Sequence, residues 1–360
     1  MEEKRCGWID AVKGIAILGV VLVHSMSGME LPSVLEKISQ TGDKGVQIFF
    51  IVAAYLAYGS YGKNLNKGKS VAYWWKNRII RIAPAYYIAI ITSMLFLGGS
   101  TQWIGVVEKI SAANMIAHIS FLHGLSPYYI NSILGVEWYL ADYVILMLLI
   151  PVLYKVINNF SKSVAFLVLS SIGSYFFILM SRNWSIISDT QVWDIYIGSF
   201  GFLAQLPVMA MGIVLYFLIN DNRIWERCTD KKILSYALLA GSVYGIVILM
   251  AGVSFKGLTI QVVYGGILFV FILSQAIYGC PLIDNCFWRT LGSHSYLIYL
   301  FHYFFIMTFN HFWGRIAGSS IKAWGIRFVF VWAVSWIMIF LEDRIKKMIR
   351  SSRTGFARRF

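Results

Sequence analysis

The sequence predicts an all-α fold, a polytopic transmembrane bundle of about ten helices with both termini cytoplasmic. Three observations lead to this prediction. Of the 360 residues, 58% are hydrophobic and only 13% are charged, which is about half the charged share of a soluble domain. The apolar residues form runs long enough to cross a bilayer. The positive charges lie between these runs and are divided unevenly between the two sides.

Ten runs are long enough, at about 20 mostly apolar residues each, to span the hydrocarbon core. They lie at roughly 9–27, 45–62, 82–98, 137–157, 163–181, 201–219, 233–252, 258–278, 293–313 and 322–341. The first run carries Asp10 and Lys13 and has no convincing small-residue cleavage site, so we interpret it as a span and not a signal peptide. A shorter apolar stretch at 114–125 predicts a re-entrant or interfacial helix.

The positive charges predict the orientation. With the N-terminus inside, the cytoplasmic segments hold 22 of the 31 Lys and Arg residues, the outer segments hold eight, and Lys13 lies inside the first span. Cytoplasmic loops are enriched in Lys and Arg, so this bias favours two cytoplasmic termini. We expect one membrane domain over residues 1–341 and a basic cytoplasmic tail over 342–360.

The net charge of +14 is compatible in principle with nucleic-acid binding. The basic residues flank the spans, however, and form no separate basic domain, so we expect them to contact lipid headgroups. The predicted partners therefore include the lipid bilayer and no nucleic acid. The four cysteines form no CxxC pair and fall on the predicted cytoplasmic side, where disulfides are rare. No metal site is expected.

The first span carries three ionisable residues, Asp10, Lys13 and His24. Lys13 and His24 are about 20° apart around the helix and about 16 Å apart along it. Ionisable groups inside spans are costly and usually functional. A histidine near the outer end of the span is suited to accept a proton from a hydroxyl group. The alternative for Asp10 and Lys13 is an ion pair near the interface, with the lysine reaching toward the headgroups.

Arg78 and Arg81 follow the second span and are three residues apart, so they share one face of a helix. Paired guanidinium groups are suited to bidentate contacts with phosphates. An interfacial helix that only sets the topology would show the same spacing.

Two further motifs carry candidate residues. Glu137, Trp138 and Asp142 begin the fourth span, where the acids could serve as general acid or base or simply favour the helix N-terminus. Tyr296, Tyr299 and His302 are spaced to share one face of the ninth span. Packing of a polar stripe against another helix explains the second motif without catalysis.

These segments, in this order, resemble the acyltransferase-3 family of membrane O-acyltransferases. The family's first span reads as an acid, a basic residue, Gly, Ala and His, and its second span begins with a Gly-Val and Phe-Phe pattern. An Arg-x-x-Arg motif before proline and a late Leu-Gly-x-x-Ser-Tyr-x-x-Tyr-Leu-x-His motif follow. The matching positions are Asp10, Lys13, Gly14, Ala16, His24, Gly45, Val46, Phe49, Phe50, Arg78, Arg81, Pro84 and the segment 291–302.

The resemblance covers roughly residues 8–341 and departs from the family in three places. Lys13 stands where the family usually has arginine. Ala53 and Ala54 replace a Ser-Gly pair. Asp142 lies one residue earlier than the family's acid, and Glu137 is an alternative for that role.

The resemblance implies an enzyme, an acyltransferase that transfers groups other than aminoacyl groups, in the bacterial cytoplasmic membrane. The donor would be cytoplasmic acyl-CoA, with acetyl-CoA expected first, and there would be no tightly bound cofactor. The acceptor would be a hydroxyl of a cell-envelope or secreted carbohydrate or glycolipid. His24 matches the family's catalytic base and Arg78 and Arg81 match its donor-associated pair.

The remaining site residues take roles in this scheme as expectations. We expect Asp10, Lys13, Glu137 and Asp142 to support catalysis around His24. The expected lining of a substrate cavity is Trp138, Tyr296, Tyr299 and His302. His24 could act as a base or carry the acyl group transiently. The alternative function is a multi-span transporter or a non-catalytic scaffold, and the acceptor, acyl chain and oligomeric state stay open.

Overall fold

The computed structural model describes residues 7–99, 109–221 and 229–357, and these ranges contain helices and no strand. The long helices are α1 (Gly7–Ser25), α3 (Gly45–Asn66), α4 (Val71–Leu97), α6 (Trp138–Val156), α7 (Phe160–Asn183), α9 (Phe202–Asn220), α11 (Lys231–Met250), α12 (Ile260–Ile277), α14 (Ser295–Ala317) and α15 (Ile321–Ala357). Shorter helices are α2 (Ser33–Thr41), α5 (Ala112–Ile119), α8 (Thr190–Ile195) and α13 (Cys286–Ser293), with single turns at Gly42–Lys44, His123–Leu125 and Tyr196–Phe200.

The fold confirms the predicted polytopic helical bundle. Within the described ranges, nine helical segments are long and apolar enough to cross a membrane. They correspond to nine of the ten expected runs. The tenth run, 293–313, forms α14, which has 23 residues and enough length to span. It is not among the nine, and its sequence includes His302, Asn310 and His311.

Helix α5 accounts for the apolar stretch that was too short to span. It has eight residues, about 12 Å of helix. Ser111 caps its N-terminus by accepting a hydrogen bond from the Asn114 N–H. The segment then turns through His123–Leu125 and leads to the start of α6.

The close packing of α1 against α13 depends on glycine. A Cβ atom on Gly292 would lie 1.6 Å from the Asp10 carbonyl oxygen, and one on Gly14 would lie 2.2 Å from the Trp288 carbonyl oxygen. Small residues let membrane helices approach at backbone distance. Gly14 of α1 and Gly292 of α13 therefore allow the two helices to pack backbone against backbone.

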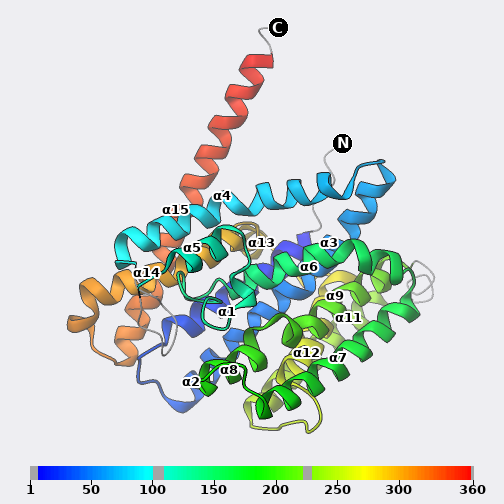
Figure 1. The fold of residues 1–360 in the computed structure, drawn as a ribbon, viewed down its shortest axis with the longest axis horizontal. Helices are drawn as coiled ribbons and strands as arrows, with labels where there is room; N and C mark the ends of the chain where they lie inside the picture. The colour runs from blue at the N-terminus through cyan, green and yellow to red at the C-terminus, as the bar shows by residue number, and fades with distance from the viewer. Residues whose placement is uncertain (1–6, 100–108, 222–228, 358–360) are drawn as a thin grey trace.

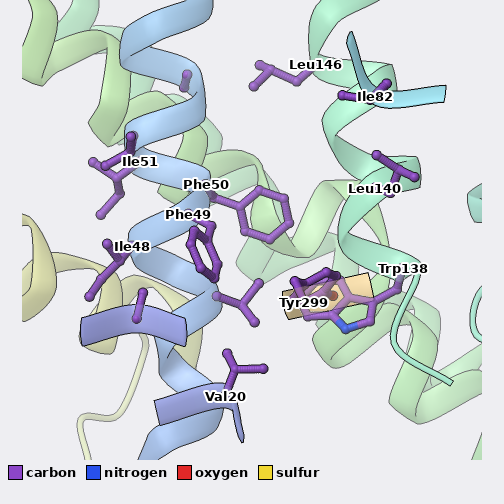
Figure 2. Close-up of a cluster of buried hydrophobic side chains, with 14 of the residues drawn as sticks. Val20, Ile48, Phe49, Phe50, Ile51, Ile82, Trp138, Leu140, Leu146 and Tyr299 are labelled. Atoms are coloured by element: carbon purple, nitrogen blue, oxygen red, sulfur yellow. The ribbon is translucent and has the colours of Figure 1, made fainter. Parts of the chain in front are cut away.

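The core lies where α3, α6 and α14 meet, and it is rich in aromatic rings. Figure 2 shows Phe49 and Phe50 of α3 on the side that faces Trp138 and Tyr299. The ring centroids of Phe50 and Trp138 are 5.6 Å apart, and those of Phe49 and Tyr299 are 6.3 Å apart. Edge and tilted contacts at these distances stabilise beyond the area they bury.

Helix α1 begins on the side of the bundle from which α15 projects (Figure 1). Helix α15 continues from Ile321 to Ala357, through the expected boundary at residue 341. Residues 342–357 of the expected basic tail thus continue the last span, and their first turns lie at the rim of the cavity described next.

Candidate active site

A cavity of about 410 Å³ lies between α1, α3, α4, α6, α14 and α15. This volume falls within the range of small-molecule sites. Of the sequence-predicted residues, the structure brings together Lys13, Arg78, Arg81, Tyr296 and Tyr299 in the cavity wall. Residues from the first span, the arginine motif and the late tyrosine motif therefore share one site.

The rim of the cavity carries a net positive charge. Lys13 pairs with Asp10 at 2.7 Å, and Lys346 of α15 pairs with Glu342 at 2.7 Å. The two arginines have no carboxylate among their described ion pairs and supply the excess charge. Arg81 is exposed and Arg78 half-buried. The site can therefore attract an anionic ligand.

Arg78 is held by neighbours on two helices. Its guanidinium donates to the Ser60 hydroxyl and to the Leu56 carbonyl of α3, and it lies 5.5 Å from the centre of the Trp74 ring. Ser70 caps α4 by accepting from the Tyr73 N–H. These contacts fix the first turns of α4, so the side chain of Arg78 is ordered at the cavity wall.

Two tyrosines tie α14 to the opposite wall. The Tyr296 hydroxyl donates to the Ile82 carbonyl at 2.9 Å, one residue after Arg81. The Tyr299 hydroxyl donates to the Val136 carbonyl, just before the start of α6. The late motif therefore fixes the arginine helix and the loop before α6 at the same time.

His24 and His302 form a pair beyond the inner end of the cavity. Their ring centroids are 5.1 Å apart, and the His24 ring is also 5.7 Å from Tyr303. Tyr299 lines the cavity, and its ring centroid is 5.8 Å from that of His302, so this tyrosine links the cavity wall to the pair. Neither histidine is among the described residues of the cavity wall.

The tautomer of neutral His302 follows from its hydrogen bonds. Its Nδ1 lies 2.7 Å from the Tyr299 carbonyl, which can only accept, so Nδ1 carries the proton. Nε2 is buried and has no hydrogen-bond partner among the described residues. That nitrogen therefore keeps its lone pair without a described partner.

Glu137 lies away from the cavity and holds the loop before α6. One carboxylate oxygen accepts from the Ile133 and Leu134 N–H groups at 2.7 and 3.0 Å and from His118 at 3.1 Å. The other accepts from the Val136 N–H at 3.0 Å. Burial acts to raise the pKa of this carboxyl, but the His118 contact, then His123 and the Ile133 N–H, outweigh it and lower the pKa. The geometry suits a loop clamp.

Asp142 and Trp138 also lie outside the described cavity wall. Asp142 is fully buried in α6, and neither carboxylate oxygen has a hydrogen-bond partner within the described ranges. Trp138 packs between Phe50 and Phe200 at centroid distances of 5.6 and 4.9 Å. The tryptophan is part of the core, whereas the aspartate has no packing explanation.

Three features were missed by the sequence reasoning. His118 and His123 stack with centroids 4.3 Å apart beside Glu137. Their signal is weak because single histidines outside a recognised motif predict nothing specific. His294 lies in the cavity wall, 3.2 Å from Asp343 of α15. Arg327 was counted as an outer charge but is buried, and its place inside an apolar run was a usable signal.

The fold and site define a class: a multi-pass helical membrane protein with a basic cavity at one end and a histidine pair deeper in the bundle. The chain belongs to the acyltransferase-3 family, since the model of that family's acyltransferase domain matches residues 7–342 of 360, nearly the whole chain. The protein is therefore an integral membrane acyltransferase. No curated protein and no solved structure matches the chain.

Proposed function

We propose that the protein transfers an acyl group, first of all acetyl, from cytoplasmic acyl-CoA to a hydroxyl of a cell-envelope or secreted carbohydrate. The observation that carries the proposal is the cavity whose wall joins Arg78 and Arg81 to Lys13 and the two tyrosines. Family membership supplies acyl transfer as the reaction class.

The donor phosphates would bind at the arginine end of the cavity. Arg78 and Arg81 carry the excess positive charge there, and guanidinium groups match phosphate oxygens in geometry. The positive-inside bias of the sequence supports a cytoplasmic position for this end. The acyl arm would then extend along the tyrosine-lined wall toward Tyr299.

His24, with His302 packed beside it, would transfer the proton of the acceptor hydroxyl. His24 takes the proton of the acceptor hydroxyl as its oxygen attacks the thioester carbonyl. A C–O bond forms, the C–S bond breaks, and CoA leaves as a thiolate that takes the proton back from His24. The neutral His302 ring, held by the bond between its Nδ1 and the Tyr299 carbonyl, would support the His24 ring at a centroid distance of 5.1 Å. Because neither histidine is among the described residues of the cavity wall, the acyl group would have to pass Tyr299, whose ring contacts His302, to reach the pair.

The test of catalysis uses membranes that contain the protein, radiolabelled acetyl-CoA and cell-envelope material. The wild type should incorporate label into a carbohydrate fraction, and His24→Ala should not. His311→Ala is the matched control, because His311 is an exposed histidine on α14. Transfer that survives His24→Ala would remove the base assignment. A folded wild type that labels nothing, over a range of donors and acceptors, would favour the transporter or scaffold alternative.

The donor site has its own test. The double variant Arg78→Ala with Arg81→Ala should raise the Kd for acetyl-CoA by at least about tenfold, because each charge-assisted contact contributes about 1.5–3 kcal/mol. The matched control is Lys67→Ala with Lys76→Ala, which removes the same charge from exposed positions near α4. An equal loss of affinity in both pairs would show that net charge, and not a built site, binds the donor.

A further inference from the structure

Arg327 is a charged side chain in the interior of the bundle. It is the seventh residue of α15 and is 1% exposed, the largest fully buried side chain in the described part of the chain. Ionisable residues inside membrane segments are rare and costly, and they persist where they have a role. The contacts of this guanidinium identify the role.

The guanidinium of Arg327 binds the C-terminal end of α1. Its Nε donates to the Ser25 carbonyl at 2.8 Å, and its Nη2 donates to the Ser25 and Ser27 carbonyls, the latter at 2.7 Å. Ser25 is the last residue of α1. The final carbonyls of a helix have no intrahelical partner and carry the negative end of its dipole. Arg327 satisfies these carbonyls and complements their charge.

The same guanidinium also binds the helix that carries His302. Its Nη1 donates to the Asn310 side-chain oxygen of α14 at 2.9 Å. Asn310 lies eight residues after His302, about 12 Å along the helix. His24, on α1, directly precedes Ser25. The planar guanidinium of Arg327 therefore joins α1 and α14, the two helices whose histidine ring centroids are 5.1 Å apart.

We propose that Arg327 is a positioning residue for acyl transfer, which sets the His24 ring against the His302 ring by clamping the end of α1 to α14. This inference rests on the proposed function of the histidine pair. Displacing a reacting group by about 1 Å can cost about 100-fold in rate. Loss of the clamp should therefore lower kcat and leave donor binding unchanged, because the arginines that would bind the donor lie near the opposite end of α1.

The experiment compares Arg327→Met, Asn310→Ala and the wild type in acetyl transfer from labelled acetyl-CoA. Arg327→Met should lower kcat on the order of 100-fold with an unchanged KM for acetyl-CoA. Asn310→Ala removes only the bond to α14 and should give a smaller fall in kcat. Arg327→Lys keeps the charge without the planar guanidinium and should restore only part of the rate. Lys322→Met, an exposed cation on the same helix, is the control and should leave kcat unchanged.

A second readout does not depend on activity. Modification of His24 by diethyl pyrocarbonate, followed by mass spectrometry, should be faster in Asn310→Ala and Arg327→Lys than in the wild type and the Lys322→Met control. Unchanged modification with unchanged kcat in these variants would overturn the positioning role. A wild type without transfer activity would reject the proposed function, whereas faster His24 modification in the variants would still support the clamp.

Discussion

Substitution of Glu137 tests whether this acid has a catalytic role or a structural one. Its carboxylate accepts three backbone N–H groups and the His118 ring, and it is fully buried. In Glu137→Gln the amide oxygen can keep the contacts of one carboxylate oxygen. The amide NH₂ then faces the Val136 N–H, donor against donor.

The cost of Glu137→Gln can be worked from these contacts. An orphaned buried N–H costs about 1–3 kcal/mol, and loss of the ionic attraction to His118 brings the total to about 3–5 kcal/mol, typical of a broken buried pair. The thermal midpoint in detergent micelles, followed by tryptophan fluorescence, should fall on the order of 5–10 °C. Acetyl transfer should fall with it as the loop loosens.

The matched control is Glu36→Gln. Glu36 is an exposed residue of α2, and its carboxylate accepts from the Gln40 side chain at 3.0 Å. Its replacement should shift the midpoint hardly at all. The loop-clamp assignment fails if Glu137→Gln keeps the wild-type midpoint. Loss of transfer at an unchanged midpoint would instead support the catalytic role expected from the sequence.

Three other substitutions test the fold and site. Burial, and then the neighbouring His118 charge, lowers the pKa of His123 to about 4. His123→Phe should therefore reduce the loss of unfolding free energy between pH 6.5 and 4. The folded state favours the neutral ring, so about 3 kcal/mol of stability that the wild type has above pH 6.5 is lost on acidification. Urea midpoints across this pH range measure the loss. An equally steep loss in the variant would contradict the role of His123. Gly292→Ala should destabilise by about 3 kcal/mol or prevent folding, because its methyl would meet the Asp10 carbonyl; Gly266→Ala, with open space around it, is the control for detergent melting. Asp142→Leu should raise the thermal midpoint, because it removes a buried carboxylate without a described partner. It should also lower acetyl transfer if Asp142 supports catalysis. A lower midpoint would show that the substitution removed a stabilising interaction.

The spans were predictable because their signal is local. Length and hydropathy over about 20 residues define a membrane helix, and each expected run is helical in the structure. The shared face of Arg78 and Arg81 is also a local property, since it depends only on helical spacing. The face shared by Tyr296 and Tyr299 is a local property for the same reason. The two arginines and the two tyrosines line the same cavity.

The contacts between spans were not predictable, because they join residues far apart in the sequence. His24 meets His302, and Arg327 reaches Ser25 across 302 positions. Periodicity shows that a residue faces the bundle interior, but not which helix it faces. The role of Gly14 was hidden for the same reason. A glycine in a span predicts a close approach somewhere, and only the structure shows that α13 is the partner.

Helix α1 sets the length of the proposed site. Gly14 packs it against α13 near the cavity, and Arg327 holds its last residue at the other end. Lys13 and His24 are therefore fixed about 16 Å apart on one face. Arg78 and Arg81 share the cavity wall with Lys13, so a donor whose phosphates bind there would have to carry its reactive carbonyl on a long arm to approach His24. Acyl-CoA has such an arm, whereas a compact acyl phosphate does not, and this difference is the reason that we propose a CoA thioester as donor.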